Sequence, residues 1–268
     1  MNKIILSMLG VVTIAVIATV ATVSYFSDTE ESNDNTFRAG SIDIKVSNEA
    51  YYNGASMDDL SWAMGDIGPE SQFINYEDIK PGDYGYNRIA TTVFDNKAWG
   101  HIVLNKKADS DVTCTEPETQ DVRDTSCSQD PPLVANGELD YELFFIAWVD
   151  DNDNGVKEAG ENLLLVNNSR DNSGWSNNAP FNPLVSPDGV MDPEEEYAIA
   201  LGWCVGLPDG VTPGKYGNEN MGLLAGAEVD ISTCDGSAIG NRAQSDELVV
   251  DVILQVEQYR HNDVPSWN

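Results

Sequence analysis

The stretch Ser41–Val46, with the sequence SIDIKV, alternates polar and apolar side chains along the chain. A period of two places the apolar side chains on one face of a β-strand. Runs of similar character recur at Arg88–Phe94, His101–Leu104, Leu139–Val149, Asn162–Val166, Glu196–Val205 and Glu247–Tyr259. Turn formers such as Pro81–Asp83 separate these runs, and helical periodicity is scarce. The pattern predicts an all-β protein, an antiparallel β-sandwich or jelly roll.

The charge of the chain is strongly negative. Its 268 residues include 45 Asp and Glu against 14 Lys and Arg, which gives a formal net charge of −31. Such a chain repels a phosphate backbone, so we expect no nucleic-acid partner. A hydrophobic content of 41% is enough to form a core, and the length suits one large β domain.

Residues 1–24 have the pattern of a secretory signal peptide. Lys3 precedes the uncharged run Ile4–Val23, and the small residues Thr22 and Ser24 favour cleavage after Ser24. The alternative is an uncleaved anchor, because about 20 apolar residues can cross a bilayer. We therefore expect an extracellular protein whose only contact with a membrane is made through this segment.

The four cysteines all follow the signal, and an even number in an exported chain predicts two disulfides. Three pairings are possible. Cys114 and Cys127 bracket a short polar loop, so we expect them to pair with each other and leave Cys204 to pair with Cys234. The alternative is that the four residues are free buried thiols.

The remaining chain divides into a polar arm, residues 25–36, and one β-sandwich domain, residues 37–268. Two segments of this domain, residues 106–137 and 167–192, are polar and are predicted to be inserted loops. Trp99, Trp148 and Trp203 occur within apolar runs, and we expect them in the core rather than on a carbohydrate-binding platform.

The segment Asp150–Glu161, DDNDNGVKEAGE, matches the spacing of a calcium loop, with oxygen side chains at positions 1, 3 and 5, Gly at 6 and Glu at 12. Gly155 permits the sharp turn in the middle of the loop. The expected ligands of a structural Ca²⁺ are the side chains of Asp150, Asn152, Asn154, Glu158 and Glu161 and the carbonyl of Val156. The alternative is a plain hairpin turn at Asn154-Gly155, which does not require Glu161.

Several motifs resemble a known family. Tyr25, Phe26, Ser27, Asp28, Thr29 and Glu30 form an aromatic-Ser-Asp-Thr-Glu stretch, and FRAGSIDIKV follows at residues 37–46. This start resembles the TasA/camelysin family, whose members carry SipW-type signal peptides. Weaker matches resemble its archaeal branch at Ile79–Asp83, Glu116–Glu118, Gly137–Leu139, Trp203–Cys204, Asn241–Asp246 and Val256–Asn262.

The resemblance implies a jelly-roll sandwich that is exported and assembles with copies of itself into extracellular filaments of a biofilm matrix or pilus. It also implies that residues 25–30 insert as a donor strand into the next subunit. The residues agree with this role, because Tyr25 and Phe26 lead a polar arm with little means of packing on its own chain. The alternative for the arm is a disordered tail.

Two other functions are alternatives. Camelysin is classed as a metallopeptidase, but the chain has no zinc motif and its two histidines, His101 and His261, are far apart. We therefore expect no enzyme. The third possibility is a monomeric calcium-stabilised adhesin or surface-layer module, with matrix or surface-layer partners.

Overall fold

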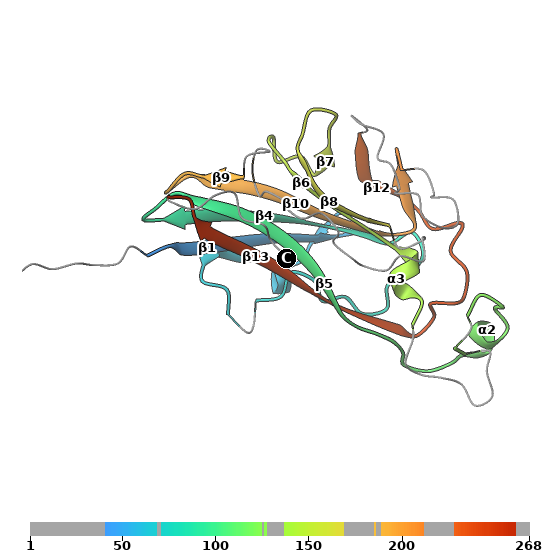
Figure 1. The fold of residues 1–268 in the computed structure, drawn as a ribbon. Coiled ribbons are helices and arrows are strands. Elements are labelled where there is room, and N and C mark those ends of the chain that lie inside the picture. The colour runs from blue at the N-terminus through green and yellow to red at the C-terminus, as the bar shows by residue number, and fades with distance from the viewer. Residues whose placement is uncertain are drawn as a thin grey trace, which may run out of the picture. The chain divides into compact units, whose positions relative to one another are not determined.

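The computed structural model describes residues 41–68, 71–124, 126–127, 137–168, 185, 189–211 and 228–260 (Figure 1). The chain divides into two units, Met1–Ala39 and Gly40–Asn268, and every described residue belongs to the second. The signal segment and the arm at residues 25–36 therefore lie outside the described residues. Within the described part of the chain, no helix is long and apolar enough to cross a membrane.

The largest sheet has seven strands in the order β2-β1-β4-β10-β6-β8, and β3 also pairs with β1. Its described strands pair antiparallel with their neighbours. Its strands are β1 (Asp43–Tyr52), β2 (Ala55–Ser56), β3 (Trp62–Gly65), β4 (Tyr84–Phe94), β6 (Leu143–Val149), β8 (Leu163–Asn168) and β10 (Glu196–Val205).

Two smaller sheets accompany it. The first has the order β13-β5-β9, from β13 (Asp246–Gln258), β5 (Ala98–Asp111) and β9 (Val190–Met191). The second has the order β11-β12-β7, from β11 (Leu207–Asp209), β12 (Val229–Asp235) and β7 (Val156–Lys157). The described helices are single turns: η1 (Asp58–Leu60), α2 (Glu116–Thr119) and α3 (Leu139–Glu142).

The central strands of the large sheet, β4, β6 and β10, are mostly buried, and β6 packs on both faces, which explains its nearly continuous apolar sequence LFFIAWV. Phe145 faces a core shared with β5 and β13, whereas Phe144 faces a second cluster shared with β12. The same alternation in β10 sends Trp203 to the first cluster and Ala200 to the second. The prediction of an all-β antiparallel sandwich is thus confirmed, and the jelly-roll order of its strands stays a prediction.

Each segment predicted by alternation overlaps a strand, although several strands are longer than predicted: Arg88–Phe94 lies within β4 and His101–Leu104 within β5. Glu196–Val205 is β10 with the predicted bounds, and Glu247–Tyr259 corresponds to β13. The expected core tryptophans Trp99, Trp148 and Trp203 are 6%, 0% and 2% exposed. The strands of two to four residues were not predicted, because so short a segment shows no alternation. The seven-residue β12 was not predicted either.

Three predicted segments are corrected. The start of Leu139–Val149 is the helical turn α3, because Asp140 and Glu142 bind Lys106 Nζ and Arg242 Nε at 2.6 Å each. The predicted loop 106–137 begins too early, since β5 continues to Asp111 by pairing with β13. The predicted loop 167–192 likewise overlaps β8, which ends at Asn168, and β9, and much of the rest lies outside the described residues.

Both expected disulfides are formed. Cys114 is bonded to Cys127, 13 residues away, and Cys204 is bonded to Cys234, 30 residues away. The described residues contain no free cysteine. Closing a loop of about 15 residues stabilises a folded chain by about 3 kcal/mol.

Candidate functional site

The acidic loop, Asp150–Glu161, connects the paired strands β6 and β8 and contains β7. Asp150 is buried at its start, and its carboxylate accepts the N–H groups of Asn154 at 3.2 Å and Gly155 at 3.0 Å. The hydroxyl of Tyr86 on β4 donates to the same carboxylate at 3.0 Å. Gly155 has φ +73°, so the turn requires the conformation predicted for it.

The other predicted ligands of the acidic loop form hydrogen bonds within the loop. Glu158 Oε1 accepts the side-chain amides of Asn152 at 3.1 Å and Asn154 at 2.6 Å. Glu161 accepts the N–H groups of Asp151 at 3.1 Å and Glu158 at 2.8 Å. The structure therefore gathers the five predicted side chains into one hydrogen-bonded turn. Val156 lies opposite Asp230, where β7 pairs with β12.

Two acidic side chains of this turn, Glu158 and Glu161, lie close together. Burial, followed by the neighbouring Glu158, raises the pKa of Glu161 to about 7. The amides of Asn152 and Asn154 lower the pKa of Glu158, so the negative charge is held on that residue. Glu158 Oε2 is buried and has no hydrogen-bond partner. A proton or a cation would relieve this crowding, and an oxygen-rich turn suits a hard cation such as Ca²⁺.

The geometry does not choose between the two interpretations of this loop. A carboxylate or amide oxygen that accepts one N–H group keeps a second lone pair for a metal. However, the described groups of three or more acidic or sulfur ligand atoms within 4.8 Å of one another all include Asp111 and not Asp150. Calcium in the acidic loop stays a prediction, and so does the plain hairpin turn.

A second feature is the outer edge of β13, called here the open edge. β13 pairs with β5 along its 13 residues, and no other described strand pairs with it. Its outer side therefore carries backbone N–H and C=O groups without a strand partner in the described chain. An edge of this length is a ready template for another strand.

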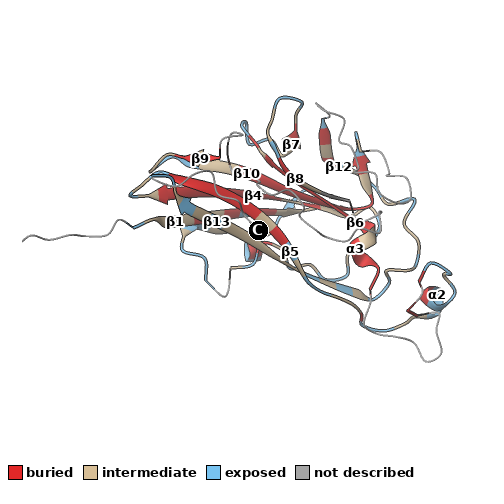
Figure 2. Ribbon diagram, viewed as in Figure 1, coloured by how far each residue is buried: buried red, intermediate tan, exposed pale blue. Residues whose placement is uncertain are grey.

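The side chains of β13 are also incompletely covered. Five alternate apolar residues pack against the main core but are only partly buried: Leu248, Val250, Val252, Leu254 and Val256. Figure 2 shows β13 in the colours of intermediate and exposed residues, whereas β4 and β10 are mostly buried. The apolar side chains of this strand are therefore only partly covered by the rest of the domain.

Sequence reasoning predicted the strand but not its position at an edge. The alternation of residues 247–259 gives the strand, whereas its neighbours depend on the tertiary fold. The expected donor residues Tyr25–Glu30 lie outside the described residues.

One of the two histidines, His101, belongs to the described residues. His101 is buried on β5, 3.4 Å from the side-chain oxygen of Gln255, and burial lowers its pKa. His261 lies outside the described residues.

Comparison with known proteins finds no matching family model and no matching curated protein.

Proposed function

We propose that the chain is a secreted structural protein, a subunit of extracellular filaments or of a biofilm matrix. Subunits assemble by donor-strand complementation, in which residues 25–30 of one copy pair with the open edge of the next. Calcium in the acidic loop stabilises the subunit. The observation that carries the proposal is the open edge, because β13 has no second strand partner among the described residues along its 13 residues, which leaves a place for one more strand.

The two sheets of the sandwich differ in size, which supports this mode of assembly. The large sheet has seven strands, while β13, β5 and the two-residue β9 form the sheet that covers it. A donor strand beside β13 would bury apolar surface of its five alternate residues and bond its outer backbone groups. Aromatic side chains such as Tyr25 and Phe26 bring a large apolar area to such a contact.

Export is supported by the disulfides. Both pairs are formed in the described domain, and such bonds persist in oxidising compartments outside the cytosol. They agree with the predicted signal segment and with an extracellular filament.

The charge of the chain bears on assembly. The full chain carries a formal charge of −31, and all of its acidic residues lie after residue 24, so copies repel one another unless salt or bound cations reduce the repulsion. Calcium is therefore expected to favour both the folded subunit and contact between subunits.

The test uses the chain from residue 25 onward, which contains all of the described domain. We expect filaments by negative-stain electron microscopy, and loss of filaments when residues 25–35 are deleted. A double variant, Tyr25→Ser with Phe26→Ser, separates the aromatic anchors from arm length, and Ser27→Ala with Thr29→Ala is its matched control. Filaments that persist after the deletion would overturn donor-strand assembly.

The acceptor is tested by adding a peptide of residues 25–36 to the deleted chain. We expect protection from hydrogen exchange to appear in β13, and no protection with a scrambled peptide. A chain that stays monomeric with and without its arm, and whose β13 gains no protection, would instead be a surface module.

A further inference from the structure

A second group of acidic residues lies far from the acidic loop, where β5 ends and β13 begins. Asp111 is the last residue of β5 and lies directly opposite Asp246, the first residue of β13. Three more carboxylates approach Asp111. Glu118 lies on α2, Asp124 follows α2, and Glu138 directly precedes α3. We call this group the Asp111 cluster, and its members are Asp111, Glu118, Asp124, Glu138 and Asp246.

The Asp111 cluster is almost entirely buried. The exposed fractions are 2% for Asp111, 0% for Glu118, 0% for Asp124 and 3% for Glu138, and Asp246 is partly buried. Ligand oxygens of Asp111, Glu118 and Asp124 lie within 4.8 Å of one another. Those of Asp111, Glu138 and Asp246 do so as well, which places Asp111 at the centre.

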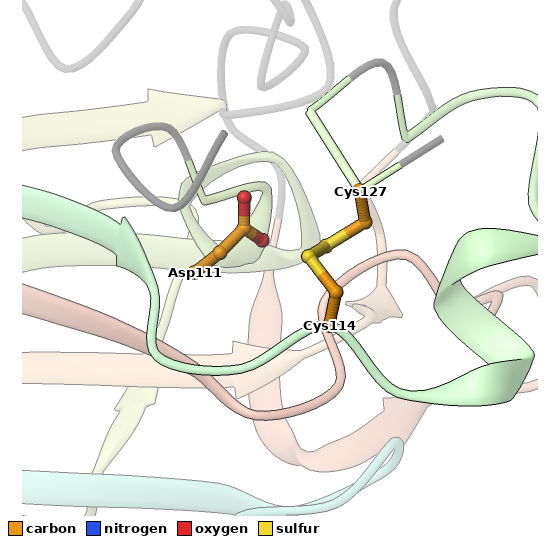
Figure 3. A group of neighbouring side chains, drawn as sticks. All are labelled: Asp111, Cys114 and Cys127. Carbon is orange, nitrogen blue, oxygen red and sulfur yellow. A yellow bond between two sulfur atoms is a disulfide. The ribbon is translucent and has the colours of Figure 1, made fainter. Parts of the chain in front are cut away.

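The disulfide next to the cluster fixes the segment that carries two of its members. Figure 3 shows the Asp111 carboxylate beside the bond between Cys114 and Cys127. The bond closes the loop that contains Glu118 and Asp124 and holds this loop against the end of β5. Because both sulfur atoms are in the disulfide, they are not free thiolate ligands, and the available donors are oxygens.

One oxygen in four of the five carboxylates is anchored by a hydrogen-bond donor. Asp124 Oδ1 accepts the N–H of Cys127 at 2.7 Å, and Asp111 Oδ2 accepts the hydroxyl of Ser126 at 2.6 Å. Glu118 Oε2 accepts the N–H of Thr115, and Asp246 Oδ2 that of Glu138, at 2.7 and 2.6 Å.

The other oxygens have no partner. The buried atoms without a hydrogen bond are Asp111 Oδ1, Glu118 Oε1, Asp124 Oδ2, Glu138 Oε2 and Asp246 Oδ1. Five buried acceptors without a donor are costly unless something binds them. The anchored oxygens orient the carboxylates, and the unpartnered oxygens are the ones available to a ligand.

The basic residues near the Asp111 cluster are bound to other acids. Arg242 Nε donates to Glu142 at 2.6 Å, Lys106 Nζ to Asp140 at 2.6 Å and Arg123 to Asp121 at 2.6 Å. None of these ion pairs involves a carboxylate of the Asp111 cluster.

We propose that the Asp111 cluster binds a calcium ion. Carboxylate oxygens are the ligands of hard cations, and Ca²⁺ takes six to eight of them in a flexible arrangement, as donors from separate segments would provide. Mg²⁺ demands a near-ideal octahedron and keeps several waters, which a buried cluster of five carboxylates does not favour. The ion would tie the end of the β5–β13 pair to the disulfide loop and to α3.

This site goes beyond the proposed function, since it requires neither filaments nor calcium in the acidic loop. The test therefore uses the variant Glu161→Gln to remove calcium binding by the acidic loop. In that background we measure calcium binding by isothermal titration calorimetry, and thermal unfolding in chelator, in calcium and in magnesium. We expect calcium heat and a rise in Tm of about 5–10 °C at a calcium concentration a hundred times the Kd. Magnesium should give a smaller rise.

The diagnostic variant is Asp246→Asn. Its amide keeps an oxygen for the N–H of Glu138 and offers an N–H₂ group to Asp111, so the variant should fold without the ion. We expect it to lose the calcium heat and the calcium-dependent rise in Tm in the Glu161→Gln background. The matched control is Glu247→Gln, a neighbouring exposed acid, which should keep both.

Three results would overturn the proposal. The first is no calcium heat and no rise in Tm in the Glu161→Gln chain. The second is calcium binding that survives in the Asp246→Asn variant. The third, an equal rise in Tm with magnesium, would overturn the assignment to calcium. Calcium heat that is lost with Glu161→Gln but kept with Asp246→Asn would place the ion in the acidic loop instead. The two variants therefore distinguish calcium binding at the Asp111 cluster from calcium binding in the acidic loop.

Discussion

Asp111 and Asp246 lie directly opposite each other at the end of the β5–β13 pair, two acidic residues in a cross-strand position. Like charges in this position destabilise a sheet. The described pairing extends over 13 residues, so the two strands hold this pair together despite the repulsion. The local cost is relieved by a proton or by a cation, and the conditions of the solution should therefore control the stability of this end of the sandwich.

The pH dependence of calcium-free protein follows from the same residues. Glu138 and Asp246 have pKa values of about 8 in the folded chain, well above 4.5 and 3.8, because they are buried beside other acids. The folded chain thus holds protons that the unfolded chain has released between about pH 4 and pH 8. The free energy of unfolding should fall as the pH rises through this window.

The measurement is urea unfolding in chelator at pH 5, 6.5 and 8. The variant Asp246→Asn should show a weaker fall, whereas Glu247→Gln should match the unaltered chain. Stability that rises from pH 5 to pH 8 in chelator would contradict the expected protonation.

The Cys114–Cys127 bond should stabilise the protein and hold the disulfide loop over Asp111. Replacing both cysteines by alanine removes a closed loop with a sequence separation of 13, at a cost of about 3 kcal/mol. We expect Tm to fall by about 6–12 °C for a domain of this size. Calorimetry should also show weaker calcium binding at the Asp111 cluster, because Glu118 and Asp124 lose their fixed position.

The matched control replaces Cys204 and Cys234 by alanine. This bond closes a longer loop far along the chain from Asp111, so it should lower Tm without changing the affinity of the cluster for calcium. Equal losses of calcium affinity in the two double variants would argue against a local role for Cys114–Cys127.

Gly85 lies where β4 passes the buried ring of Trp203. A Cβ atom at this position would lie 2.2 Å from the indole Nε1, so no side chain fits without displacing the ring. Gly85→Ala should cost about 1–3 kcal/mol and lower Tm in thermal unfolding. Gly68→Ala is the control, because nothing lies within 4 Å of a Cβ atom there, and an equal loss of stability would refute the packing argument.

Tyr86 connects the large sheet to the acidic loop through its hydroxyl. Tyr86→Phe removes the hydrogen bond to Asp150 and should cost about 0.5–1.5 kcal/mol. If calcium binds in the loop, its affinity there should also fall, because Asp150 loses a group that orients it. Calorimetry in the Asp246→Asn background isolates the loop, and an unchanged affinity would show that Tyr86 does not position this ligand.

The strands were predictable because their signal is local. In β10, the alternation and the flanking residues gave the bounds of Glu196–Val205, and in β1 the SIDIKV motif gave the register of the two faces. The turn around Gly155 was equally predictable, since a positive φ angle and a hairpin depend on neighbouring residues. The polar end of β5 was missed, because backbone pairing with β13 and not an apolar face forms it.

No local sequence pattern predicted the Asp111 cluster. Its five acids are spread from residue 111 to residue 246, and in a chain with 45 acidic residues no spacing distinguishes them. Only the unpartnered oxygens and the burial of these carboxylates set them apart from solvated acids.

The sequence by itself determined the strands, the paired cysteines and the sharp turn of the acidic loop, because alternation, even cysteine number and glycine conformation act over short distances. The tertiary structure decided which acids meet at Asp111 and that β13 lies at the edge of its sheet in the described chain. These depend on strand order and on contacts between distant segments, and the physical reason is that burial and pairing are properties of neighbours in space rather than in sequence.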